Sequence, residues 1–182
     1  MKNETNPPLA SNQSSASSEG FTTSGDAAAM SGVAETYRQQ SKSGARWFFW
    51  VAALSMINSV VVLIAHGSWN FLAGLGITQV ISGFALGVSE GMEGAVAVTV
   101  VALALDLMVA LVFLALGLFA QKSYTWAFVI GMVIYALDGV IFLLVQEWLA
   151  VAFHAFVLYS IYRGLAANRR LNALKAEGLA FA

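Results

Sequence analysis

An acid and an imidazole lie in one long apolar stretch of the sequence, YALDGVIFLLVQEWLAVAFH at residues 135–154. Asp138 and His154 are each eight residues from Gln146, which begins the polar pair Gln146-Glu147. If the chain turns at this pair, two antiparallel helices place both side chains about 12 Å from the turn, at 1.5 Å per residue. At equal depth, a carboxylate can accept a hydrogen bond from an imidazole and fix its tautomer. The sequence therefore predicts that Asp138 and His154 face each other.

Three further polar residues are expected near this depth: Asn58, Asp106 and Tyr135. A charged side chain at the centre of a membrane helix costs about 2.5 to 3.5 kcal/mol, so aspartates there are expected to face the protein interior. We expect these three residues to join Asp138 and His154 in a polar layer inside the membrane.

The polar layer admits three interpretations. It can be a buried hydrogen-bonded group that fixes helix packing, with Asp106 protonated or bonded to Asn58. It can be a path for protons or cations, because an imidazole titrates near neutral pH. It can also be a metal site, but one buried histidine and two carboxylates are a thin set of ligands. The structural interpretation is favoured, and no metal, no cofactor and no catalytic residue is predicted.

The elements that must hold this layer are membrane helices. Of the 182 residues, 59% are hydrophobic and 10% are charged, and the mean hydropathy is +0.74. This composition is rare among soluble domains. The formal net charge of −1, with no clustered basic surface, argues against nucleic-acid binding. The absence of cysteine excludes disulfides, thiolate metal sites and cysteine nucleophiles.

The apolar stretches predict four transmembrane helices, at about residues 47–65, 95–120, 124–145 and 148–164. With four spans and both termini cytoplasmic, all nine Lys and Arg fall on the inside. A fifth span between residues 67 and 94 would move Lys122 and every basic residue after it outside. The sequence therefore predicts an all-α integral membrane protein, a four-helix bundle in the cell (inner) membrane with N-in/C-in topology.

The regions outside the spans are expected to differ in order. Residues 1–44 are rich in Ser, Gly and Thr, which predicts a disordered cytoplasmic tail, although a short juxtamembrane helix over residues 26–41 is an alternative. This tail lacks the basic and apolar regions of a secretory signal peptide. Residues 45–166 form the predicted membrane domain. Residues 167–182 are expected to continue the last helix into the cytoplasm, where their basic side chains meet anionic lipid headgroups.

The segment 67–94 is apolar and rich in glycine. Gly83, Gly87 and Gly91 recur at four-residue spacing, which on a helix allows close packing against a neighbour. The segment is predicted to be external, and both a re-entrant half-helix and an interfacial loop fit it. Residues 87–91 also match the G-x-S-x-G pattern around Ser89, but a nucleophile elbow needs an α/β sheet, so Ser89 is not predicted to be catalytic.

One part of the sequence resembles known proteins. The sequence resembles an uncharacterised family of small multi-pass bacterial membrane proteins. The resemblance rests on the stretch YALDGVIFLL, followed by Trp148, then FHAF and the basic stretch YRGL at the end of the last span. The resemblance covers about residues 46–166 and implies a four-helix bundle in a bacterial inner membrane, but no activity. Because the expected external loops are too short for a receptor domain and no nucleotide motif or Cys/His cluster is visible, we expect a non-enzymatic accessory or scaffolding subunit in the lipid bilayer, with a membrane-protein partner or as a homo-oligomer. The alternative is a small proton- or cation-coupled transporter or channel.

Overall fold

The computed structural model describes residues 16–64, 75–77, 80 and 95–178 of the chain. These ranges contain four long helices, α1 (Ala16–Ile64), α3 (Ala95–Gln121), α4 (Thr125–Leu144) and α5 (Trp148–Ala176). Each of the four contains a stretch that is long and apolar enough to cross a membrane. The prediction of an all-α protein with four candidate spans is therefore confirmed.

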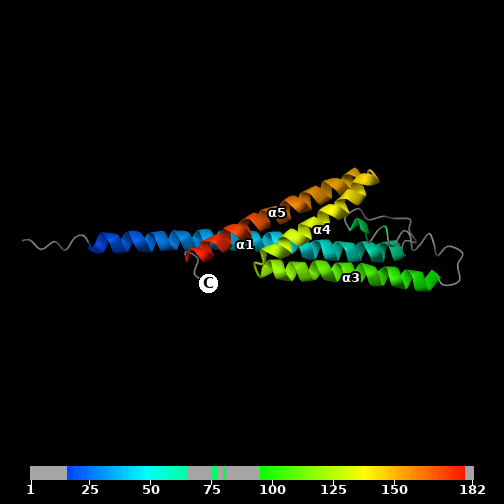
Figure 1. Cartoon of the computed structure of the whole chain (residues 1–182), viewed down its shortest axis with the longest axis horizontal. Coiled ribbons are helices and arrows are strands. Elements are labelled where there is room, and N and C mark those ends of the chain that lie inside the picture. Colours follow the sequence, from blue (N-terminus) through cyan, green and yellow to red (C-terminus); the bar gives the residue numbers. More distant parts are fainter. Residues whose placement is uncertain (1–15, 65–74, 78–79, 81–94, 179–182) are drawn as a thin grey trace, which may run out of the picture.

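The helices are arranged as two antiparallel pairs (Figure 1). α3 lies alongside the C-terminal half of α1, and α5 runs back along α4. The second pair is inclined to the first, so that α5 also contacts α1 and α4 also contacts α3. The two pairs meet near the α3–α4 turn and diverge toward the α4–α5 turn (Figure 1).

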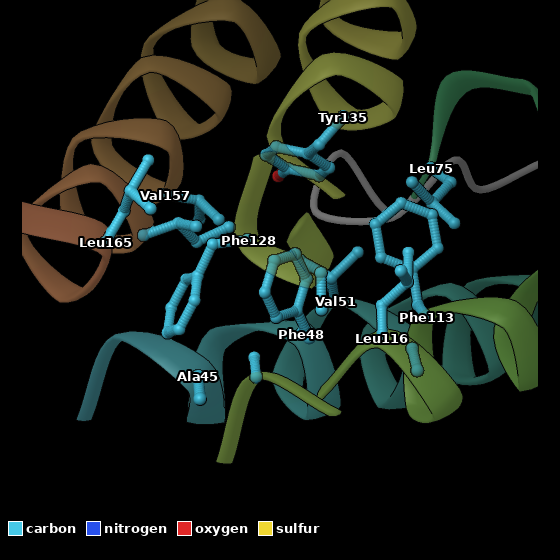
Figure 2. Packing of buried hydrophobic residues seen from close by; sticks show 14 of the residues in the cluster. Ala45, Phe48, Val51, Leu75, Phe113, Leu116, Phe128, Tyr135, Val157 and Leu165 are labelled. Carbon is cyan, nitrogen blue, oxygen red and sulfur yellow. The ribbon is translucent and has the colours of Figure 1, made fainter. Parts of the chain in front are cut away.

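The hydrophobic core lies where the two pairs meet. Phe48 of α1 packs between Phe113 of α3 and Phe128 of α4, at ring-centroid distances of 6.3 and 6.1 Å (Figure 2). The side of α4 that faces this ring carries Gly131, and a Cβ atom there would overlap the Phe48 ring. A large side chain on one helix thus fits against a position without a side chain on the next, as close packing requires.

Two glycines bring α1 and α5 into backbone contact. A Cβ atom on Gly44 would lie 2.5 Å from the Cα atom of Gly164. Such contacts between small residues let membrane helices approach closely. One turn further along, the buried hydroxyl of Ser41 donates to Oδ1 of Asn168 at 3.3 Å. The crossing point is therefore specified by packing and by a hydrogen bond.

Both tight turns use a residue with positive φ. Gln146 has φ 60°, which lets α4 end at Leu144 and α5 begin at Trp148, where the length of the apolar stretch predicts a turn. Ser123 has φ 67° in the α3–α4 turn. Its carbonyl oxygen accepts from Nδ2 of Asn168 at 3.1 Å and of Asn172 at 3.3 Å. Side chains of α5 therefore hold the α3–α4 turn.

The first helix begins well before the predicted first span. The sequence predicts a disordered tail over residues 1–44, whereas α1 is helical from Ala16 and residues 1–15 lie outside the described residues. Buried positions recur at helical spacing from Ala34 through Ser41 and Ala45. Packing against α5 thus supports α1 from Ala34 onward, since most helical stability in proteins comes from tertiary contacts.

Candidate functional site

The α4–α5 hairpin brings the acid and the imidazole together. Nε2 of His154 lies 3.0 Å from Oδ2 of Asp138, and each side chain is only 3% exposed. Both residues lie at the same distance from the turn at Gln146, so the contact follows from the register that the sequence predicts. Asp138 and His154 form the centre of the candidate site.

Aromatic rings hold the imidazole of His154 in place. The Tyr135 ring stacks on it, with ring centroids 4.4 Å apart and planes 12° from parallel. The Phe142 ring lies 4.9 Å away at an angle of 46°. Gly139 provides the necessary space, because a Cβ atom there would lie 3.3 Å from Cδ2 of His154. Packing therefore restricts the imidazole to one orientation.

The partners of His154 determine where its hydrogens lie. Nδ1 is 2.9 Å from the carbonyl oxygen of Ala150. A carbonyl oxygen only accepts, so the proton on Nδ1 is assigned from this contact. Nε2 is then within hydrogen-bond distance of Oδ2 of Asp138, at 3.0 Å. Both ring nitrogens of His154 therefore have a partner inside the helix pair.

Asp138 also binds the backbone of the segment between α1 and α3. Its Oδ2 accepts from the N–H of Gly76 at 2.7 Å, and its Oδ1 accepts from the N–H of Ile77 at 2.8 Å. Residues 76 and 77 are helical, so the carboxylate satisfies backbone donors as an N-cap side chain does, but from another helix. One carboxylate thus connects α4, α5 and this segment.

The same segment packs closely against α4 and α3. Leu75 is fully buried and lies beside Phe113 in Figure 2. A Cβ atom on Gly76 would lie 2.8 Å from the Phe142 ring and 3.3 Å from the carbonyl oxygen of Asp138, so a larger residue would push the segment away. A cavity of about 230 Å³ remains between Leu75, Ile77 and the apolar side chains of α3 and α4, and Asp138 contributes to its lining.

The second buried acid bonds to α1. Asp106 of α3 is fully buried, and its Oδ2 accepts from the hydroxyl of Ser59 at 2.7 Å. Asn58, which is adjacent to Ser59, is also buried. The structure therefore buries all five predicted polar residues. It brings Tyr135, Asp138 and His154 into one group. Asp106 bonds to Ser59, whereas the sequence predicts Asn58 as its possible partner.

Other predicted features have a different outcome. Gly83, Gly87 and Gly91, together with Ser89, lie outside the described residues. Within the ranges that the structure describes, no group of three His, Cys, Asp or Glu side chains could hold a metal ion.

No family model matches the chain, and neither a curated protein nor a solved structure matches it.

Proposed function

We propose that the chain is a four-span inner-membrane protein with both termini in the cytoplasm and its helices arranged as a bundle. The support is the distribution of charge. The chain has nine Lys and Arg residues, and all of them except Lys2 lie in the described ranges. They belong to the N-terminal two-thirds of α1, the α3–α4 turn or the C-terminal half of α5. These parts lie at one end of the membrane helices (Figure 1), which we call the basic end. The positive-inside rule puts the basic end in the cytoplasm.

The opposite end of the helices then faces outward. It carries the α4–α5 turn with Glu147, and the segment at residues 75–77 approaches α4 on this side of the core (Figure 1). The bonds from Gly76 and Ile77 to the buried Asp138 favour a re-entrant segment over an interfacial loop, because an interfacial loop would not reach a side chain inside the helix pair.

As the function, we propose a non-enzymatic accessory or scaffolding subunit that holds a partner through α1. The observation that carries this proposal is the exposed stretch at residues 25–33 of that helix. All of these residues are exposed except Met30, which is half-buried, and the next residue along the helix, Ala34, is buried. Figure 1 shows this part of α1 extending past the C-terminal end of α5.

The local sequence both favours and opposes a helix at this position, because Ala27–Met30 are strong helix formers but two glycines interrupt the stretch. The stretch contains Gly25 and Gly32, and glycine is about 1 kcal/mol less favourable than alanine in a helix interior. A Cβ atom on either glycine would meet nothing within 4 Å. A partner surface against this stretch would supply the tertiary contacts that helices normally need.

The polar layer fits the same function. The carboxylate oxygens of Asp138 accept from two backbone N–H groups and lie against His154. These bonds join elements of the fold, which supports a structural role for the pair rather than a role in solute passage.

The test is to purify the tagged chain from its native membrane in mild detergent and to weigh the intact complex by mass spectrometry. A stoichiometric foreign partner is expected. Deletion of residues 1–33 should release this partner and leave the melting temperature of the remaining protein unchanged. Gly32→Ala, which strengthens the helix without filling any contact, should keep the partner. A homo-oligomer without a foreign partner would contradict the accessory function.

A proton-coupled transporter is the second candidate, and the buried contact of 3.0 Å between the His154 imidazole and the Asp138 carboxyl group favours it. Purified protein in liposomes that contain a pH-sensitive dye would show proton flux if this function is correct. Asp138→Asn and His154→Gln should then each abolish the flux in protein that still folds. Absence of flux from the unmodified protein under an imposed pH gradient would argue against transport.

A further inference from the structure

A polar groove lies between α1 and α5 within the basic end. Its volume is about 490 Å³, and it forms beside the Gly44 contact, where the two helices cross. Polar side chains line it from both helices, with Gln39, Gln40 and Ser43 on α1 and Ser160 on α5. The Ser160 hydroxyl donates to the carbonyl oxygen of Phe156 at 2.9 Å, and the Gln39 amide donates to Oε1 of Glu35 at 3.2 Å. The Gln40 amide and the Ser43 hydroxyl are the donors that can serve the oxygens of a ligand.

The groove carries one positive charge. Arg163 lines it, and none of its described lining residues is acidic. The nearest acid along α1, Glu35, forms an ion pair with Arg38 at 3.7 Å. Arg163 itself lies over the Tyr159 ring, with its guanidinium carbon 6.0 Å from the ring centroid. Five N–H donors in a planar fork suit a phosphate group, so the charge and the donors together favour an anionic ligand.

One side of the groove is aromatic. Trp47 lines it and packs edge-to-face against Phe156 of α5, with ring centroids 5.2 Å apart. Trp47 is also the first residue of the predicted first span, and tryptophan is enriched at the boundary between headgroups and acyl chains. A ligand that fills the groove would therefore place a polar part beside Arg163 and an apolar part beside Trp47.

We propose that this groove binds the headgroup of an anionic phospholipid. The phosphate lies at Arg163, the remaining headgroup oxygens accept from Gln40 and Ser43, and the acyl chains run over the Trp47 side. A free phosphate ion shares the chemistry of the first contact but has no apolar part. The aromatic side of the groove and its place at the start of a span favour the lipid. The proposal is independent of any partner protein.

The experiment uses the full-length protein in vesicles of neutral phosphatidylcholine with increasing amounts of phosphatidylglycerol that carries brominated acyl chains. Bromine quenches tryptophan fluorescence at contact, so quenching reports binding, and brominated phosphatidylcholine gives the reference. We expect the unmodified protein to prefer the anionic lipid and Arg163→Gln to lower this preference by about 5-fold, the effect of one basic residue near a membrane surface. Arg169→Gln, which removes an exposed charge from the same helix outside the groove, should lower the preference less than Arg163→Gln does, because it loses only the general attraction of a surface charge.

Three results would overturn the proposal. The first is an equal loss of preference in Arg163→Gln and Arg169→Gln, which would indicate diffuse surface charge. The second is equal quenching by anionic and neutral lipid in the unmodified protein. The third is Arg163-dependent binding of inorganic phosphate in neutral vesicles, with lipid quenching the same in both variants. If Arg163→Gln does not fold, Gln40→Leu tests the same groove at constant charge: it should weaken the preference, and an unchanged preference would also overturn the proposal.

Discussion

Replacement of Asp138 by asparagine tests the role of the buried carboxylate. The carboxylate accepts from Gly76 N–H at 2.7 Å and from Ile77 N–H at 2.8 Å, one on each oxygen. An asparagine side chain has one oxygen and one NH₂ group, so in either orientation one of these two backbone donors faces another donor. A buried donor without an acceptor costs about 1 to 3 kcal/mol.

Amide hydrogen exchange measures this loss at its source. A cost of about 1 to 3 kcal/mol corresponds to an increase of about 5- to 150-fold in the equilibrium for local opening, so exchange at Gly76 and Ile77 should accelerate by that factor in Asp138→Asn. His154→Gln is the matched control, because it alters the other partner of the carboxylate and leaves both backbone bonds in place. Unchanged exchange at residues 76–77 in Asp138→Asn, or equal acceleration in His154→Gln, would contradict the assignment of the Asp138 carboxylate as the acceptor of these two bonds.

The remaining predictions concern packing and can be measured by unfolding in detergent micelles. Gly44→Leu should destabilise the protein by about 1 to 3 kcal/mol because it forces the two crossing helices apart, whereas Gly32→Leu, at an open position, should not destabilise it. Gly131→Ala should cost about 1 to 3 kcal/mol because the phenylalanine ring packed on it must move, and an unchanged stability would show that the core is loosely packed. Asn168→Ala should cost about 1 to 3 kcal/mol, more than Asn172→Ala, because Asn168 is fully buried and bonds both α1 and the α3–α4 turn; equal effects would contradict this.

Features that depend on neighbours along one helix or across one tight turn could be predicted from the sequence. The four candidate spans follow from the length of the apolar stretches. The contact between Asp138 and His154 follows from their equal distances to Gln146, because helical rise converts these distances into equal depth. The burial of Asp106 follows from the cost of exposing a charge to lipid.

Features that depend on contacts between distant parts of the chain could not be predicted. The bonds from residues 76 and 77 to Asp138 use backbone N–H groups, which every residue except proline has, so no residue type indicates them. The contact of Gly44 with Gly164 joins two helices far apart in the sequence. Because glycine has no side chain, neither residue indicates its partner. A helix over residues 26–41 was an alternative, but its extension to Ala16 was not predicted, because the preceding residues are dominated by Ser, Thr and Gly.

The bond from Gly76 to Asp138 also sets an order of events during synthesis. The two residues are 62 positions apart in the chain, and His154 follows Asp138 by another 16. The donors at residues 76 and 77 therefore leave the ribosome before their acceptor exists. They can dock only after α4 has been synthesised, and His154 completes the site when α5 follows. The binding of residues 76 and 77 to Asp138 is thus a late step of assembly. A chain that ends after α3 cannot form these bonds, because it lacks Asp138.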